Sequence, residues 1–250
     1  MFVHTINPVL LSLGPFEIRY YGIVYALAFV FAFLFLHRAR KSENLPLSRE
    51  EVDSLMVSVV IGTLVGARLF EVLFYHPAFY FRHPLEIFAL WHGGLSFHGG
   101  FIGVVIAVAL FCRNKKVSLL QIGDHLVIAA ALSLALGRIA NFINGELYGR
   151  ITTLPWAVKF PGAEGFRHPS QVYEAVKNTA IFVTLLRVNP SRHREGYRVA
   201  LFLLLYGVFR FVIEFVREPE VFVGPLTMGQ VLSLPMIALG LWMVKRTSKA

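Results

Sequence analysis

Seven long apolar runs divide the chain, and each is long enough to cross a bilayer as a helix. About 20 apolar residues cover roughly 30 Å of hydrocarbon, at about 1.5 Å per residue. The pattern therefore predicts an all-α integral membrane protein with seven transmembrane helices, organised as a single transmembrane domain over residues 1–250. Glycine and polar residues interrupt the third and fourth runs, so the ends of these runs are the least defined. The predicted spans are 20–36, 53–75, 94–112, 119–141, 169–187, 199–216 and 227–244.

The basic residues of the loops give these helices a direction. Alternate loops carry fourteen Lys and Arg on one side and six on the other, and the richer side is normally cytoplasmic. We therefore expect the N-terminus outside, the C-terminus in the cytoplasm, and segment 142–168 as a short cap or loop on the outer surface. The richer set is Arg38, Arg40, Lys41, Arg49, Arg113, Lys115, Lys116, Arg187, Arg192, Arg194, Arg198, Lys245, Arg246 and Lys249, and the poorer set is Arg19, Arg82, Arg150, Lys159, Arg167 and Arg217.

The composition agrees with a membrane protein and excludes several other classes. Hydrophobic residues make up 56% of the chain and charged residues 16%, with 23 Phe. The net charge of +9 does not indicate nucleic-acid binding, because the basic residues lie in short loops between apolar runs. The single cysteine, Cys112, excludes an internal disulfide and is interpreted as a structural residue. No cleavable signal peptide is evident, so the first span is expected to direct its own insertion.

In this orientation the polar residues of the spans gather toward their outer ends. Polar residues that only join helices to one another should be scattered over both leaflets. A charged side chain near the membrane core costs about 2.5–3.5 kcal/mol, and one that is retained usually faces a polar cavity. We therefore expect a single functional site on the outer side. The residues placed there are Tyr20, Tyr21, Arg68, Glu71, Ser96, His98, Arg138, Asn141, Gln171, Glu174, Arg210, Glu214 and Gln230.

The segment from Gly137 to Arg150 carries the strongest chemical signal. It places an arginine, two asparagines and a glutamate among several glycines at the end of an apolar run. Glycine allows a backbone to turn sharply or to approach a ligand closely. The forked donors and permanent charge of a guanidinium suit phosphate. The segment therefore predicts an anion-binding pocket at a membrane surface.

The sixth span adds a polar face at its outer end. Tyr206, Arg210, Glu214 and Arg217 are spaced by four, four and three residues, so they share one face of a helix. Two interpretations of Arg210 and Glu214 stay open: substrate binding, which we favour, and a charge pair that lowers the cost of burying both groups.

Two other groups have a structural explanation. Arg68 and Glu71 are three residues apart, and we favour an ion pair between them. Pro169 and Ser170 open the fifth span, where proline and serine suit the first turn and the cap of a helix. Capping explains three neighbours less well, and we expect these to face the cavity: Gln171, Tyr173 and Glu174.

His98 lies in a glycine-rich segment, residues 91–100. An isolated histidine near a helix start is usually structural, but the four glycines suit a closely packed backbone that lines a cavity. Ser96 is badly spaced for a serine–histidine dyad with His98, and no Gly-x-Ser-x-Gly is present. Metal patterns such as His-Glu-x-x-His are absent as well, so no metal site is predicted.

These segments resemble the signature regions of the bacterial phosphatidylglycerol–prolipoprotein diacylglyceryl transferase family. The resemblance covers essentially the whole chain, including the motif at 137–150, the histidine segment at 91–100 and the block at 168–174. Further matches are Tyr21-Gly22, Tyr206 to Arg210, Glu214 to Pro219, Met228 to Gln230, and Ser233 to Pro235. His92 stands where an acidic residue is common in this family, so the role of His92 stays open.

The resemblance implies a reaction at the outer face of the bacterial cytoplasmic (inner) membrane. Such an enzyme transfers the sn-1,2-diacylglyceryl group of phosphatidylglycerol to the lipobox cysteine of a preprolipoprotein. The products are a thioether and glycerol 1-phosphate, and no metal or organic cofactor is expected. The partners implied are phosphatidylglycerol, the signal peptide of the preprolipoprotein and the lipid bilayer.

The resemblance also suggests roles for residues. We expect Arg138 and Arg210 to hold the headgroup and to neutralise the departing phosphate. His98 is a candidate base for the thiol, since the unperturbed pKa of histidine lies near the operating pH. Alternatively, the arginines lower the pKa of the thiol itself. The remaining residues assigned to substrate binding are Tyr21, Asn141, Asn144, Glu146, Gly149, Tyr206, Glu214 and Arg217.

Two other classes of function remain as alternatives. Intramembrane arginines and helices broken by glycine are compatible with a transporter or channel for an anionic solute. A lipid-binding scaffold without catalytic activity would explain a headgroup pocket but not the histidine segment.

Overall fold

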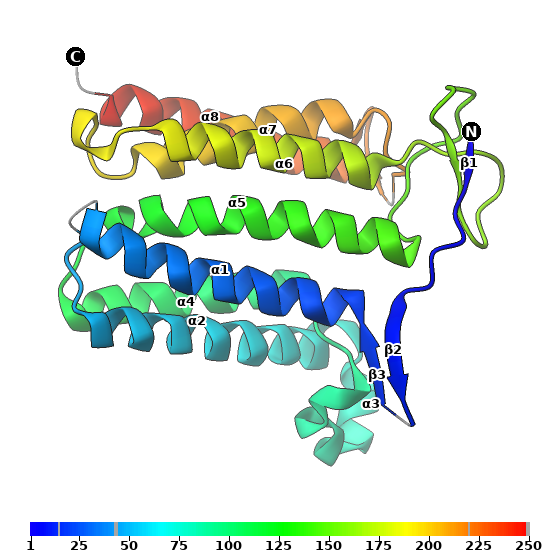
Figure 1. Ribbon diagram of the computed structural model, residues 1–250, viewed down its shortest axis with the longest axis horizontal. Helices are drawn as coiled ribbons and strands as arrows, with labels where there is room; N and C mark the ends of the chain where they lie inside the picture. Colours follow the sequence, from blue (N-terminus) through cyan, green and yellow to red (C-terminus); the bar gives the residue numbers. More distant parts are fainter. Residues whose placement is uncertain (15, 43–44, 220, 249–250) are drawn as a thin grey trace. The chain divides into compact units, whose positions relative to one another are not determined.

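The computed structural model describes residues 1–14, 16–42, 45–219 and 221–248 and is mostly helical (Figure 1). The chain forms two compact units. One comprises residues 36–122, and the other comprises residues 1–35 and 123–250. Helices α1 (Tyr20–Ser42) and α5 (Leu119–Asn144) each run from one unit into the other. Each unit is described by itself.

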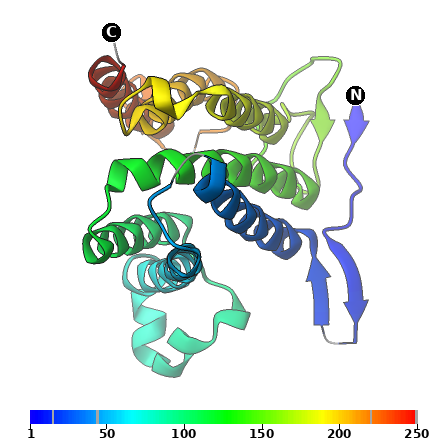
Figure 2. The same cartoon turned by 60° about the vertical axis from the view of Figure 1, so that its left-hand side comes forward.

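The unit of residues 36–122 is built on a closely packed pair of helices. Helix α2 (Arg49–Phe70) continues into a π-helical turn, η1 (Glu71–Tyr75), and packs against α4 (Phe97–Lys115), as Figure 2 shows. Glycines permit this approach, because a Cβ on Gly66 would lie 2.3 Å from the carbonyl oxygen of Gly99. At its start, α2 has a capping box in which the side chains of Ser48 and Glu51 satisfy free backbone amides.

Arg68 organises the segment that joins these two helices. The segment contains three short helices: α3 (Pro77–Arg82), η2 (Pro84–Phe88) and η3 (Leu90–His92). The buried Arg68 guanidinium donates hydrogen bonds to five of the surrounding carbonyl oxygens, those of Glu86, Ile87, Ala89, Gly93 and Gly94.

The predicted ion pair between Arg68 and Glu71 is therefore wrong. Carbonyl groups of the joining segment take the donors of the Arg68 guanidinium, while Glu71 accepts from His76 at 2.7 Å. Spacing along the helix brings Arg68 and Glu71 to the same side, but the folded segment offers the arginine a richer set of acceptors.

The second unit is a group of helices joined by loops that contain short strands. Helices α6 (Ser170–Arg187), α7 (Tyr197–Ile213) and α8 (Met228–Thr247) lie side by side, with α7 packed against both neighbours (Figure 1). A short helix, η4 (Pro190–Arg192), joins α6 to α7. The apolar core includes Ile128 and Ala131 of α5 together with Ile181 and Leu185 of α6.

Short strands pair with one another in the loops of this unit. Strands β2 (Val9–Leu13) and β3 (Phe16–Arg19) form an antiparallel hairpin directly before α1. At the start of the chain β1 (Phe2–Val3) pairs in parallel with β4 (Val158–Lys159) inside the predicted cap. Strands β5 (Phe222–Val223) and β6 (Leu226–Thr227) pair before α8.

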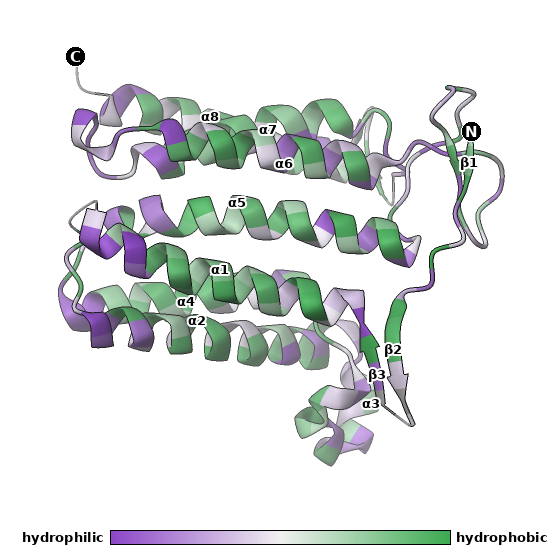
Figure 3. Ribbon diagram, in the orientation of Figure 1, coloured by the Kyte–Doolittle hydropathy of each residue, from purple (hydrophilic) through white to green (hydrophobic). Residues whose placement is uncertain are grey.

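Within the part of the chain that the structure describes, five helices are long and apolar enough to cross a membrane: Tyr20–Ser42, Arg49–Tyr75, Phe97–Lys115, Leu119–Asn144 and Met228–Thr247. Apolar residues dominate the middle of these helices in Figure 3. Many large apolar side chains on their surfaces are exposed, which suits contact with lipid. The other two predicted spans also form helices, α6 and α7, of 18 and 17 residues. The chain is therefore a helical, multi-pass membrane protein.

Candidate functional site

The start of α6 is held by the loop that follows α5. The Ser170 hydroxyl donates to the carbonyl oxygen of Leu147 at 3.0 Å, and the Gln171 amide donates to that of Glu146 at 2.6 Å. Both side chains are fully buried. The predicted capping role of Ser170 is wrong, because its side chain binds the loop and makes no cap hydrogen bond. These contacts fix the position of Glu174, one turn further along α6.

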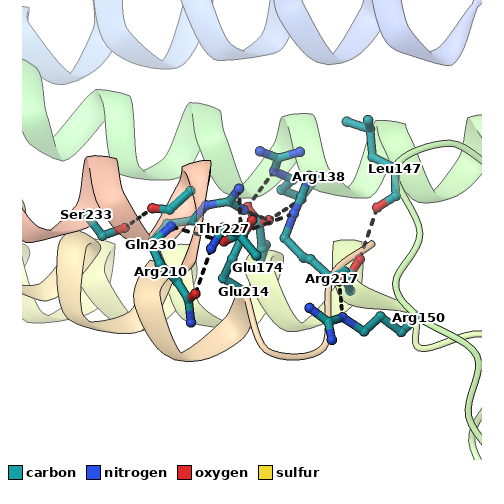
Figure 4. Close-up of polar contacts among 12 residues, drawn as sticks. Arg138, Leu147, Arg150, Glu174, Arg210, Glu214, Arg217, Thr227, Gln230 and Ser233 are labelled. Carbon is teal, nitrogen blue, oxygen red and sulfur yellow. Dashed lines mark hydrogen bonds and ion pairs between the residues drawn. The ribbon is translucent and has the colours of Figure 1, made fainter. Parts of the chain in front are cut away.

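Glu174 lies at the centre of a cluster of cations. Its carboxylate is completely buried, and its Oε1 accepts from Arg210 at 2.6 Å and from Arg217 at 2.5 Å. The other oxygen, Oε2, lies 2.8 Å from Nε of Arg138. Figure 4 shows the three arginine side chains converging on this carboxylate. We refer to Glu174, Arg138, Arg210 and Arg217 as the arginine cluster.

Helix α7 brings two of these arginines together with a second carboxylate. Arg210 Nη2 lies 2.8 Å from Glu214 Oε2, one turn further along the helix, and Arg217 Nε lies 3.7 Å from the same oxygen. The charge pair between Arg210 and Glu214, the less favoured of the two interpretations, is therefore present, and the favoured role in substrate binding stays a prediction. The Arg210 side chain keeps 18% of its surface exposed, so pairing leaves part of it free for a ligand.

The end of α5 supplies a chain of amide groups leading to Arg138. Arg138 donates to Asn141 Oδ1 at 3.3 Å, and Asn141 donates in turn to Glu146 Oε1 at 2.7 Å. Asn144 lies 3.4 Å from the same Glu146 oxygen. The Arg138 side chain is 20% exposed, while Asn141 is buried. Polar residues of the segment from Gly137 to Arg150 thus form a hydrogen-bonded network around the accessible Arg138 guanidinium.

Gly149 allows two loops to meet beside the arginine cluster. Its amide donates to the carbonyl oxygen of His168 at 2.8 Å, and a Cβ here would lie 2.3 Å from the carbonyl oxygen of Val216. Arg150 Nε reinforces this junction by donating to the carbonyl oxygen of Arg217 at 2.9 Å (Figure 4). Only a residue without a side chain fits, so Gly149 is a packing requirement of the site.

His168 lies at this junction of the two loops. Its Nδ1 lies 3.3 Å from the Tyr173 hydroxyl, which also accepts a hydrogen bond from Trp156 at 2.7 Å. Partial burial lowers the pKa of the His168 imidazole below its ordinary value, because burial disfavours the charged form. Burial therefore favours the neutral form of this residue.

The two tyrosines assigned to substrate binding from the sequence, Tyr21 and Tyr206, have different surroundings. Tyr21 lies at the start of α1, where its hydroxyl is 3.3 Å from that of Tyr25. Tyr25 lies within electrostatic range of Arg138 and Glu146, which brings this pair near the arginine cluster. Tyr206 presents its ring to a cation, since Nζ of Lys177 lies 4.0 Å from the ring centroid.

His98 belongs to the other unit and is described there. It lies in the first turn of α4, exposed, with Nδ1 3.5 Å from the hydroxyl of Tyr75. Ser96, two residues earlier, accepts a hydrogen bond from the Gly99 amide and caps α4. His92 pairs with Glu86 at 2.7 Å. Within its own unit, His98 is thus an accessible imidazole with one polar neighbour.

The charge of the buried groups favours an anion. Among the described residues, four basic side chains, Arg138, Lys177, Arg210 and Arg217, surround two carboxylates, Glu174 and Glu214. Guanidinium groups in a poorly solvated site bind phosphate strongly through charge-assisted hydrogen bonds. Within the described residues, no group of three or more His, Cys, Asp or Glu could hold a metal ion.

Sequence reasoning missed the central role of Glu174 and overlooked Lys177. The sequence placed Glu174 only at the cavity wall, since nothing in the spacing links it to Arg138 or Arg210, which lie 36 residues away on either side. Lys177 was the stronger available signal, because a lone lysine within an apolar span is costly and therefore marks a polar surrounding.

Comparison with known proteins adds an independent result. A family model described as prolipoprotein diacylglyceryl transferase matches residues 8–246. A phosphatidylglycerol–prolipoprotein diacylglyceryl transferase of Geobacter sulfurreducens is 44% identical over 250 residues, covering 98% of this chain and 96% of the relative. For the enzyme of that name from Nitratidesulfovibrio vulgaris the identity is 44% over 247 residues, with 96% and 94% covered. A Bordetella avium relative with the same name is 44% identical over 251 residues, with 97% and 95% covered.

Proposed function

The chain belongs to the prolipoprotein diacylglyceryl transferase family, and from this premise we propose that it transfers the diacylglyceryl group of phosphatidylglycerol to a prolipoprotein cysteine. The observation that carries the proposal is the arginine cluster. Arg138 and Arg210 converge on one buried carboxylate, yet each keeps about a fifth of its side chain exposed. A phosphate placed there would meet two guanidinium groups whose orientation is already fixed.

The reaction is a displacement at the glyceryl carbon bonded to the phosphate. The cysteine sulfur forms a bond to this carbon, and the carbon–oxygen bond breaks. Its electron pair leaves with the phosphate as sn-glycerol 1-phosphate, and the thiol proton passes to a base. Arg138 and Arg210 would stabilise the charge that develops on the leaving phosphate, which is where preorganised donors contribute most to rate.

The surrounding residues would hold these arginines and shape the headgroup pocket. Glu146 aligns the amides of Asn141 and Asn144, and Asn141 orients Arg138. Gly149 keeps the two loops together beside them. The other residues that we assign to substrate binding are Tyr21, Tyr206, Glu214 and Arg217.

His98 is our candidate for the base that accepts the thiol proton. The exposure of its imidazole supports this role, since a base must be reached by the incoming thiol. The alternative is that Arg138 and Arg210 favour the thiolate by their charge, so that no protein base is required. A purified His98→Gln protein with unchanged turnover would remove His98 from the mechanism.

For the arrangement in the cell we propose seven membrane-spanning helices that form a single transmembrane domain. The N-terminus would lie outside, the C-terminus in the cytoplasm, and segment 142–168 would form a periplasmic cap. The distribution of basic residues supports this orientation. The site would face the outer leaflet of the bacterial inner membrane, where both the lipid and the lipobox cysteine of a translocated preprolipoprotein are within reach.

The experiment that tests this function uses purified protein, phosphatidylglycerol vesicles and a lipobox peptide. Release of glycerol phosphate should accompany a matching mass gain on the peptide. A peptide with Cys→Ser should give neither product, and Arg138→Ala should lose lipid binding. The proposal fails if the wild-type protein binds phosphatidylglycerol but releases no glycerol phosphate in the presence of the cysteine peptide.

A further inference from the structure

Lys177 is a buried cation with no role in the reaction described above. It lies on α6, one turn beyond Glu174, and its side chain is 3% exposed. Its Nζ lies 3.8 Å from Glu174 Oε2 and 4.0 Å from the centroid of the Tyr206 ring. Among the described residues, no acceptor lies within hydrogen-bond distance of Nζ. Its contacts are therefore electrostatic.

The need to neutralise the Glu174 carboxylate does not explain why a lysine occupies position 177. Three guanidinium groups already lie 2.5–2.8 Å from the carboxylate oxygens. A fourth cation adds repulsion from the arginines, and burying an ammonium group without an acceptor carries a desolvation penalty. A structure that needed only to neutralise Glu174 would be better served by an apolar residue at position 177.

The lysine changes the charge that the site offers to a ligand. Among the described residues, and with Lys177 protonated, the site holds four cations and two carboxylates, a formal charge of +2. Without it the charge would be +1. The phosphodiester of the lipid carries one negative charge. A phosphate monoester approaches two negative charges above its second pKa of about 6.

We propose that Lys177 is a positioning residue that matches the charge of the arginine cluster to the dianionic leaving group rather than to the monoanionic lipid. The inference rests on the proposed function. Lys177 shares Glu174 Oε2 with Arg138, so less of the Arg138 charge is taken up by the carboxylate. When the carbon–oxygen bond breaks, its electron pair stays on the phosphate, and the charge there increases from −1 to −2. The extra cation therefore acts most strongly in the transition state and product.

The test compares two soluble ligands that differ by one charge. At pH 7 most glycerol 1-phosphate is dianionic, because its second pKa is about 6, while glycerophosphoglycerol, the deacylated headgroup, is a monoanion. Binding of both to the purified full-length protein is measured for wild type, Lys177→Met and Lys177→Gln. The variants should bind the dianion about tenfold more weakly or worse, and the monoanion less than about threefold more weakly, because one charge has been removed. Since both ligands are measured on the same preparation, a general loss of folded protein cannot produce this selectivity.

Turnover supplies a second readout. We expect kcat to fall about tenfold in the variants, while the KM for phosphatidylglycerol changes less than about threefold. Asn178→Leu is the matched control, since it removes a buried polar side chain from the same helix without changing the charge. It should leave the ratio of the two affinities unchanged.

Two results would overturn the inference. If wild type transfers the lipid but the variants bind both ligands more weakly by the same factor, Lys177 has only a structural role and the proposed function stands. If wild type neither binds glycerol 1-phosphate nor transfers the lipid, both the proposed function and this inference are refuted.

Discussion

Removing the charge of Glu174 should destabilise the protein more than any other single loss of a carboxylate around the site. Glu174→Gln keeps the size of the side chain but replaces a carboxylate with a neutral amide. The three guanidinium groups at 2.5, 2.6 and 2.8 Å would then repel one another, with Glu214 left to offset the charge of Arg210 and Arg217. The site is fully buried at Glu174, so water cannot screen this repulsion well.

The magnitude follows from the burial and the number of partners. Breaking a buried ion pair by removing one partner costs about 3–5 kcal/mol. The amide oxygen of Gln can still accept a hydrogen bond, so we expect a value near the lower end, about 3 kcal/mol. For a chain of this length that corresponds to a fall in melting temperature of roughly 6–12 °C.

The assay is thermal unfolding of purified protein in detergent, with Glu218→Gln as the control. Glu218 is 54% exposed and pairs with Arg167 at 2.7 Å, and such surface pairs contribute less than about 1 kcal/mol. Inorganic phosphate should raise the melting temperature of Glu174→Gln more than that of wild type, because an anion can replace the missing carboxylate. If Glu174→Gln melted within about 2 °C of the Glu218→Gln protein, the central role of this carboxylate would be refuted.

Three further outcomes are expected. Gly149→Ala should cost about 1–3 kcal/mol in thermal unfolding, since its Cβ would meet the Val216 carbonyl at 2.3 Å, whereas Gly22→Ala has open space and should be nearly neutral. Arg68→Met leaves five carbonyl oxygens without their donor, so limited proteolysis should cut the segment between α2 and α4 faster than in wild type; equal rates would contradict that role. The lowered pKa of His168 means that the unfolded chain binds a proton more readily, so stability is lost as pH falls. Between pH 7.5 and 5.5, the melting temperature of wild type should therefore fall further than that of His168→Gln. Equal falls in the two proteins would contradict this role of His168.

The helices could be predicted from the sequence, because apolar runs and loop charges are local signals. Each predicted span corresponds to an observed helix, and most differences are at the ends. Helix α1 continues to Ser42 rather than ending at residue 36, since Arg40 and Lys41 in its last turn interact favourably with the helix dipole. Helix α2 starts at Arg49 rather than residue 53, because a capping box on Ser48 extends the helix into polar sequence.

The partners of the buried charges could be predicted only where they lie on the same helix. The pair of Arg210 and Glu214 follows from a spacing of four residues. Glu174 meets Arg138 and Arg210 only after three helices have packed, and no local pattern records this. Arg68 was assigned wrongly for a related reason, since its acceptors are backbone carbonyls, which every residue carries.

The pairing of β1 with β4 has a consequence for the order in which the protein assembles. Phe2 pairs with Val158, and His4 also binds the backbone at Phe142 and Lys159. At about 5–20 residues per second, a ribosome makes residue 158 roughly 10–30 s after residue 2. Throughout that time the first residues have no partner strand, while the long helices α1, α2, α4 and α5 are being synthesised. The contacts around Val158 therefore form only after α1, α2, α4 and α5 have been made, and a nascent chain arrested before that point would present a free β1 strand to proteases and chaperones.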